Sequence, residues 1–275
     1  MNQPLTLMAV HAHPDDESSS TGGVLARYSD EGVQTIVVTC TNGEFGDGPA
    51  GVKPGGDGHD TAMVAQTRLA ELRQACKYLG VTDLETLGYH DSGMPEWEYR
   101  NQPEAFCNIS LDEIAGKIGD LIERYRPQVV VTYDPDGPYQ HPDHVQASRA
   151  AIAAVEATGI PAKLYLSAMR GSDWAKIADA LRAAGHQLPE WEVTPEEERR
   201  GRISEARITT TVDISSVLER KRAALMSHSS QISESWFSQI PAEVAADVFG
   251  AEHFILARNL TAASVPETDL FTGLR

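Results

Sequence analysis

Cysteine is scarce in this sequence. Its three cysteines, Cys40, Cys76 and Cys107, are odd in number and contain no Cys-x-x-Cys pair. A chain of 275 residues can bury most of the surface that its unfolded form exposes, so its core does not depend on disulfides. This pattern is typical of a protein that stays in a reducing cytoplasm.

Basic residues are also few, with 23 Lys and Arg against 40 Asp and Glu, and the formal net charge is −17. Nucleic acids and anionic membranes are recognised by clustered basic side chains, so neither is an expected partner. The amino-terminal stretch has no basic region, and its apolar segment 5–10 is too short for a signal peptide or a membrane span. We therefore expect a cytoplasmic protein.

The chain does contain β-branched and apolar runs that alternate with segments of helical periodicity. Expected strands lie at 5–10, 35–38, 84–87, 129–133, 163–169 and 208–212, and expected helices end at Glu31 or span 61–79, 110–125, 142–157 and 215–226. Strands that alternate with helices predict a Rossmann-like α/β fold, a doubly wound and mostly parallel sheet with helices on both faces. Ligands of such sheets bind beyond the carboxyl ends of the strands.

The pattern weakens after residue 170. We expect residues 1–170 to form the Rossmann-like core, and residues 171–275 to be a less regular portion that completes the same domain. Within the second part, 174–184 reads as amphipathic and 194–202 as a charged linker. Earlier in the chain, Ser110 and Glu113 predict a capping box at a helix start, and 41–60 predicts an unusually long loop.

Two clusters of polar residues follow two of the expected strands. The first is His-Pro-Asp-Asp-Glu at 13–17, and the second is Tyr-Gln-His-Pro-Asp-His at 139–144. Imidazole and carboxylate groups together suit Zn²⁺, although Fe²⁺ also accepts this donor set. Burial of so many acids and imidazoles is costly without a cation, so the two clusters predict one shared metal site.

A glycine pattern offers a competing interpretation. Residues 46–51 satisfy G-x-G-x-x-G, which would suggest a dinucleotide-binding dehydrogenase. A true fingerprint opens a helix directly after its strand, whereas this one contains Pro49 and continues into more Gly and Pro. We interpret it as a flexible wall of the active-site cleft.

The two clusters resemble the motifs of the PIG-L/LmbE-like zinc-dependent deacetylases, in the mycothiol-related actinobacterial branch. The resemblance implies that His13, Asp16 and His144 ligate zinc and that Asp15 is the general base. We place His141 as a protonated charge stabiliser that Asp143 orients. Tyr139 is a secondary catalytic candidate by the same resemblance.

Other segments carry the resemblance further. Arg68 and Asp91 match positions that grip the hydroxyls of the sugar, and the segments 228–231 and 252–254 look like carboxy-terminal segments of the same branch. The resemblance implies hydrolysis of the N-acetyl group of an N-acetylglucosamine-containing substrate such as GlcNAc-inositol. The expected partner is thus a small amino-sugar molecule, and a homo-oligomer is compatible with the sequence.

Three alternatives remain open beside this hypothesis. The chain could be a mycothiol S-conjugate amidase, a tailoring deacetylase that acts on another glycoside, or a non-catalytic module that binds metal or sugar. Some such amidases carry Lys near the position of Ser20, where this chain has a small hydroxyl. A module without catalysis would need neither Asp15 nor His141.

Overall fold

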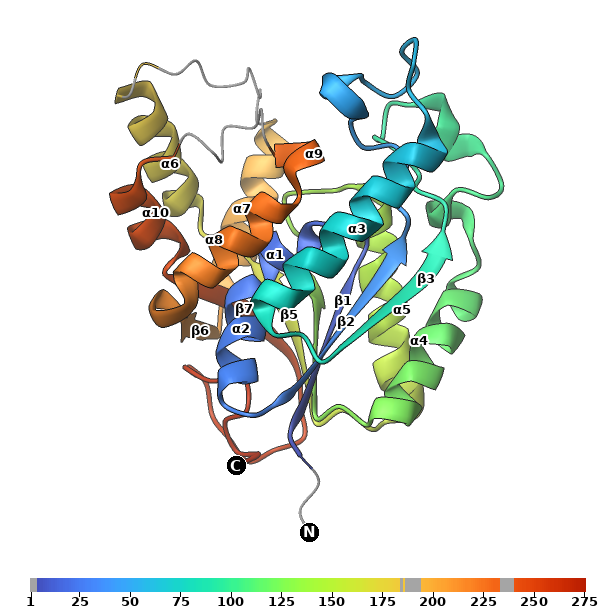
Figure 1. The fold of residues 1–275 in the computed structure, drawn as a ribbon. Coiled ribbons are helices and arrows are strands. Elements are labelled where there is room, and N and C mark those ends of the chain that lie inside the picture. The colour runs from blue at the N-terminus through green and yellow to red at the C-terminus, as the bar shows by residue number, and fades with distance from the viewer. Residues whose placement is uncertain (1–3, 184, 186–193, 233–239) are drawn as a thin grey trace.

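A computed structural model describes residues 4–183, 185, 194–232 and 240–275, and it contains one seven-stranded sheet (Figure 1). The strand order is β3-β2-β1-β4-β5-β7-β6. The strands are β1 (Thr6–His11), β2 (Gln34–Thr41), β3 (Asp83–Tyr89), β4 (Val129–Tyr133), β5 (Lys163–Ala168), β6 (Thr210–Asp213) and β7 (Ala251–Asn259). The first five pair in parallel, whereas β7 is antiparallel to both β5 and β6. The predicted mostly parallel α/β sheet is therefore confirmed.

Ten α-helices accompany the sheet in the described part of the chain. They are α1 (Asp16–Ser20), α2 (Gly22–Asp30), α3 (Thr61–Leu79), α4 (Leu111–Tyr125), α5 (Pro142–Thr158), α6 (Gly171–Ala183), α7 (Pro195–Ala206), α8 (Leu218–Ser227), α9 (Ser229–Ile232) and α10 (Ala242–Phe249). The helix expected to end at Glu31 is found as α2, which ends at Asp30, whereas the short helix α1 before it was not expected. Ala184, the last residue of the expected amphipathic segment, lies outside the described residues.

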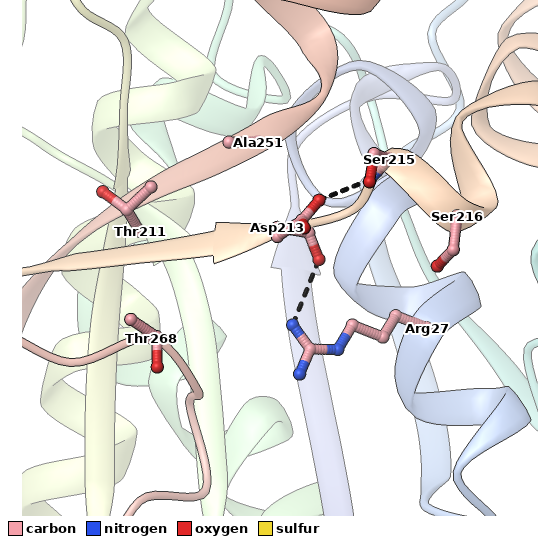
Figure 2. Close-up of a pocket in the computed structure, with 7 residues that line it drawn as sticks. All are labelled: Arg27, Thr211, Asp213, Ser215, Ser216, Ala251 and Thr268. Atoms are coloured by element: carbon pink, nitrogen blue, oxygen red, sulfur yellow. Dashed lines mark hydrogen bonds between the residues drawn. The ribbon is translucent and has the colours of Figure 1, made fainter.

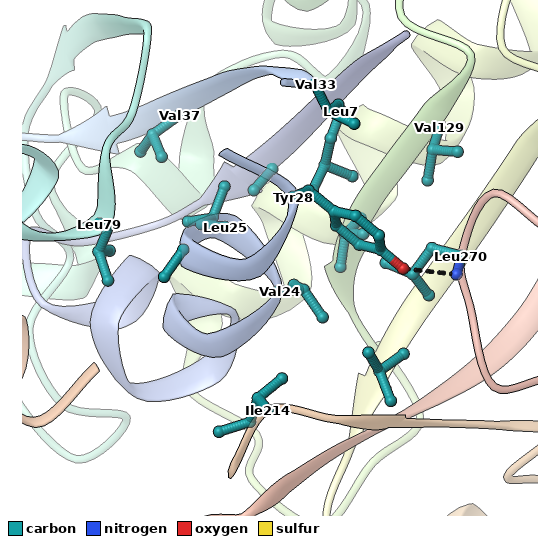
Figure 3. Close-up of a cluster of buried hydrophobic side chains, with 14 of the residues drawn as sticks. Leu7, Val24, Leu25, Tyr28, Val33, Val37, Leu79, Val129, Ile214 and Leu270 are labelled. Atoms are coloured by element: carbon teal, nitrogen blue, oxygen red, sulfur yellow. Dashed lines mark hydrogen bonds between the residues drawn. The ribbon is translucent and has the colours of Figure 1, made fainter. Parts of the chain in front are cut away.

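The alternation of side chains along β1 builds a core on each face of the sheet. Leu7 and Ala9 pack with residues of α2, α3 and α8 in one cluster, which Figure 3 shows around Tyr28. Met8 and Val10 point the other way and pack with α4 and α5. Successive residues of a strand face opposite sides, so a strand that is apolar throughout belongs between two helical layers.

The long loop predicted at 41–60 is confirmed, since it holds only a short 3₁₀ turn, Pro49–Gly51, between β2 and α3. No α-helix opens within the glycine pattern 46–51, which agrees with its rejection as a dinucleotide fingerprint.

Two local expectations were wrong. Ser110 precedes α4 but makes no side-chain capping bond, and the side chain of Glu113 accepts a hydrogen bond from the hydroxyl of Tyr89. The segment expected as a charged linker is helix α7. Thr194 and Glu197 form a reciprocal capping box at its start, and Pro195 occupies the first turn.

The portion after residue 170 adds β6 and β7 to the same sheet, and α10 precedes β7. Neither β7 nor α10 was expected from the sequence. Among the described residues, no helix is both long and apolar enough to cross a membrane.

Candidate active site and metal centre

The two polar motifs leave neighbouring strands at one edge of the sheet. β1 and β4 pair in parallel from Leu7 with Val129 to Ala9 with Val131. The chain beyond each carboxyl end therefore emerges on the same side, and it carries residues 12–17 in one case and 134–144 in the other. This arrangement brings the two motifs together, as the sequence predicted.

Three side chains, which we call the metal triad, converge there: His13, Asp16 and His144. Nδ1 of His13 lies 3.3 Å from Nε2 of His144 and 3.5 Å from Oδ2 of Asp16. Nε2 of His144 lies 3.3 Å from Oδ1 of Asp16. Ligands about 2.0–2.2 Å from a tetrahedral zinc ion are separated by about 3.3–3.6 Å. The triad therefore fits a divalent metal ion.

Asp143 orients one of these ligands. Its Oδ2 lies 3.1 Å from Nε2 of His13 and accepts a hydrogen bond of 2.9 Å from the backbone N–H of Ser92. When Nε2 of His13 donates to a carboxylate, Nδ1 keeps its lone pair for a metal ion. The expected bond from the carboxylate of Asp143 to His141 is wrong: Oδ2 of Asp143 contacts His13, and Asp143 meets His141 through its backbone N–H.

His141 begins helix α5 as its N-cap. Its Nδ1 accepts a hydrogen bond of 3.2 Å from the backbone N–H of Asp143. Burial above all, with His13 adding to it, lowers the pKa of His141 to about 2. The geometry thus favours a neutral ring with its proton on Nε2, in place of the expected imidazolium. Such a ring can still donate a hydrogen bond to a developing negative charge.

Asp15 lies beside the triad in an unusual backbone conformation. Its φ of 121° falls where side-chain-bearing residues rarely lie, at a cost of about 1–3 kcal/mol. Its Oδ2 accepts a hydrogen bond of 2.9 Å from Nη2 of Arg68. Burial raises the pKa of Asp15, while the charge of Arg68 opposes the shift. Its side chain remains 27% exposed and can reach a substrate.

Arg68 and Asp91, the two expected sugar contacts, also border the site. The guanidinium of Arg68 donates to the backbone carbonyls of Pro14 (2.6 Å) and Gly43 (2.7 Å). Oδ1 of Asp91 accepts from the backbone N–H of Gly93 and lies 3.6 Å from Nε2 of His13. Both side chains are almost fully buried, and their contact with a sugar stays a prediction.

The chain matches the PIG-L family, described as GlcNAc-PI de-N-acetylase, over residues 8–155. This chain belongs to the PIG-L family. The 1D-myo-inositol 2-acetamido-2-deoxy-alpha-D-glucopyranoside deacetylase of Acidothermus cellulolyticus is 40% identical to it, across 98% of this chain and 95% of the relative. The mycothiol S-conjugate amidase of Streptomyces coelicolor is 35% identical to it, across 100% of this chain and 99% of that relative.

Solved structures agree on the fold of this PIG-L chain. The N,N'-diacetylchitobiose deacetylase of Pyrococcus horikoshii has a TM-score of 0.59 at 21% identity, over 95% of this chain and 86% of that one. The 4-carboxy-2-hydroxymuconate hydratase of Pseudomonas putida KT2440 has a TM-score of 0.62 at 17% identity, over 94% and 99%. A deacetylase and a hydratase thus share the architecture, so the reaction has to be argued from the site.

One residue of the PIG-L site escaped the sequence analysis. Tyr133 was recognised only as the end of a strand, but its ring stacks on that of His144, with centroids 4.2 Å apart and planes 17° apart. Its hydroxyl oxygen accepts a hydrogen bond of 2.7 Å from the backbone N–H of Ala12. An aromatic side chain at the last position of the strand before the second motif was the available signal. Tyr139 is 60% exposed, and its catalytic role stays a prediction.

A surface pocket of about 450 Å³ lies apart from these motifs (Figure 2). It is lined by Arg27, Thr211, Asp213, Ser215, Ser216, Ala251 and Thr268. The guanidinium of Arg27 is already used there, because it donates to the backbone carbonyl of Asp213 and pairs with Glu31. The pocket contains no residue of the metal triad.

Proposed function

We propose that this chain hydrolyses the N-acetyl group of an N-acetylglucosamine-containing substrate such as GlcNAc-inositol. The observation that carries the proposal is the triangle of donor atoms from His13, Asp16 and His144, with the Asp15 carboxylate beside it. The 40% identical relative named as a deacetylase of such a sugar supports the choice of substrate.

We propose Zn²⁺ as the ion that the triad holds, with Fe²⁺ as the alternative because it accepts the same donors. When bound, such an ion polarises the carbonyl of the amide and lowers the pKa of a water molecule toward neutrality. Asp143 prepares the triad for this by fixing which nitrogen of His13 is free.

The other steps belong to the side chains. Asp15 accepts the proton of the attacking water as the new C–O bond forms, and Arg68 keeps that carboxylate in place. The N–H at Nε2 of His141 donates to the carbonyl oxygen as negative charge develops. Because a neutral His141 has no proton to spare, the proton on Asp15 passes to the amine as the C–N bond breaks. The neutral amine and acetic acid leave, and the acid releases its proton to water to become acetate.

Mycothiol S-conjugate amidase activity is the second candidate, since a 35% identical relative carries that name. Both reactions use the same catalytic groups on an amide of glucosamine. They differ in the size of the acyl group, and therefore in the space required beside the carbonyl.

A parallel assay of GlcNAc-inositol and a mycothiol S-conjugate, with metal analysis of the same sample, tests the proposal. We expect release of acetate and about one zinc or iron per chain. We expect Asp15→Ala to retain the metal and lose activity by about 10²–10⁴-fold. A rate unchanged by that substitution would refute the role of Asp15. Turnover of neither substrate would favour a tailoring deacetylase of another glycoside, or a binding module.

A further inference from the structure

A second network lies behind Asp15, and the mechanism above does not use it. His228 and Glu17 are both fully buried, and Nε2 of His228 lies 2.8 Å from Oε1 of Glu17. The other carboxylate oxygen of Glu17 accepts a hydrogen bond of 3.0 Å from the backbone N–H of Asp15. A continuous path of hydrogen bonds therefore runs from His228 through Glu17 to the backbone of the general base.

The positive-φ backbone conformation of Asp15 requires contacts that hold it in place. A residue with side chain at φ 121° keeps that conformation only where its surroundings hold it. Arg68 holds the side chain of Asp15, whereas Glu17 holds its backbone N–H. The direction in which the carboxylate points depends on both.

Among the described residues, the ring of His228 makes no second hydrogen bond. In the described part of the chain, its Nδ1 has no hydrogen-bond partner, so Glu17 is the side chain that its ring serves. Glu17 also accepts from the hydroxyl of Ser18, but that residue belongs to the same short helix. His228 is therefore the contact that ties Glu17 to a distant element.

The segment that carries His228 is itself fixed to the walls of the site. The amide of Gln231 exchanges hydrogen bonds of 3.0 and 3.1 Å with the backbone of Asp47 in the long loop. Ser230 donates from its backbone and its hydroxyl to Glu71, one turn beyond Arg68 on α3. The motif loop, the long loop and α3 thus meet at residues 228–231.

We propose that His228 is a positioning residue for the hydrolysis: through Glu17 it holds the backbone of Asp15 in its positive-φ conformation, and so aims the carboxylate at the attacking water. This proposal rests on the proposed function where it takes Asp15 as the base. The competing explanation is that His228 only helps the chain to fold.

The experiment compares three variants of the metal-loaded protein. His228→Ala removes the donor to Glu17, and His228→Gln returns an N–H at similar reach. His253→Ala is the matched control, because His253 is also a buried histidine near the carboxyl terminus, but it bonds the hydroxyl of Thr211. Activity, metal content, melting temperature and exchange of the Asp15 amide proton, measured by NMR, are recorded for each.

We expect His228→Ala to lower kcat about 10- to 100-fold, since a displacement of about 1 Å at a catalytic group costs this much, while KM changes less than about twofold. The metal content should stay at the wild-type value, and the Asp15 amide should exchange at least about 10-fold faster. His228→Gln should recover most of kcat. His253→Ala should lower the melting temperature and leave kcat and KM unchanged.

The path through Glu17 has its own check. If His228 acts through Glu17, the double variant with His228→Ala and Glu17→Gln should lose much less kcat than the product of the two single fold-losses. Multiplicative effects would overturn the path.

Three outcomes would overturn the positioning role: an unchanged kcat with a protected Asp15 amide in His228→Ala, loss of metal in step with activity, or a Gln variant as poor as the Ala variant. Failure of the proposed function looks different, because the wild-type protein would then turn over none of the substrates. The amide exchange would still decide the role of His228 in that case.

Discussion

The carboxylate of Asp143 decides which nitrogen of His13 can hold a metal ion. It accepts from Nε2 of His13, and the backbone N–H of Ser92 holds the same oxygen. A hydrogen-bonded partner of this kind fixes both the tautomer and the orientation of the ring, and it makes the ligand nitrogen more basic. The contact with one oxygen of Asp143 therefore leaves Nδ1 of His13 free for the proposed metal ion.

Replacing Asp143 by Ala should weaken metal binding about 10- to 100-fold, because His13 would lose the partner that selects its tautomer. Asp143→Asn keeps an oxygen that can accept from Nε2, so its affinity should lie between those of the wild-type and Ala proteins. Competition with a chromophoric chelator measures all three dissociation constants. Equal affinities would show that the tautomer of His13 is set by something else.

The sequence could predict the metal triad because each member lies in a short motif that follows a strand, and neighbouring parallel strands end together. The sequence could not predict which histidine Asp143 contacts, because a carboxylate in the second motif could reach either His13 or His141. Nor could it predict the contact of His228 with Glu17. Those residues are 211 positions apart, and nothing local links them.

Local sequence signals predicted some of the secondary-structure elements correctly, whereas tertiary contacts determine others that these signals do not show. Periodicity predicted α3 correctly, and its end at the left-handed Gly80 followed from the same pattern. In α7, the many charged residues indicated a linker, although Thr194 and Glu197 form a capping box at its start. In β7, Glu252 and His253 occupy buried positions that an apolar pattern would fill, so the strand went unrecognised.

The buried Glu252 serves the start of α2. Its two carboxylate oxygens accept from the backbone N–H groups of Gly23 and Val24, and Lys221 pairs with it at 2.7 Å. Free N–H groups at a helix N-terminus favour a negative charge. A Cβ on Gly23 would lie 2.6 Å from Cγ1 of Ile214 and 2.8 Å from a carboxylate oxygen of Glu252. The contact leaves no room for a side chain.

Gly23→Ala should therefore lower the free energy of unfolding by about 1–3 kcal/mol, the usual cost of overpacking a core. Gly116→Ala is the matched control, because Gly116 lies inside α4 and a Cβ there would meet nothing within 4 Å. The control should raise the free energy of unfolding by about 0.5–1 kcal/mol. Urea denaturation measures both, and equal signs would contradict this account.

In the molecule as a whole, the carboxy-terminal portion reaches back across the sheet. β7 pairs with β5, and Phe271 packs against the Tyr28 ring. Figure 3 shows the hydroxyl of Tyr28 accepting a hydrogen bond from the backbone N–H of Leu270. His228 reaches the first motif from the same portion. We propose on these contacts that residues 171–275 complete the domain begun by residues 1–170.

An ion pair between Lys163 on β5 and Glu267 connects the chain that follows β7 to the sheet. Both side chains are fully buried, Nζ lies 2.6 Å from Oε1, and the hydroxyl of Tyr165 donates to the other oxygen at 2.5 Å. Lys163→Met would leave a buried carboxylate without its cation, so the free energy of unfolding should fall by about 3–5 kcal/mol.

The matched variant removes both charges. Lys163→Met combined with Glu267→Leu should recover much of the lost stability, because a buried pair can be replaced by apolar groups at little cost. The metal triad is untouched in either variant, so kcat per folded molecule should stay at the wild-type value. If the double variant unfolds as readily as the single one, the packing at this position matters more than the unpaired charge.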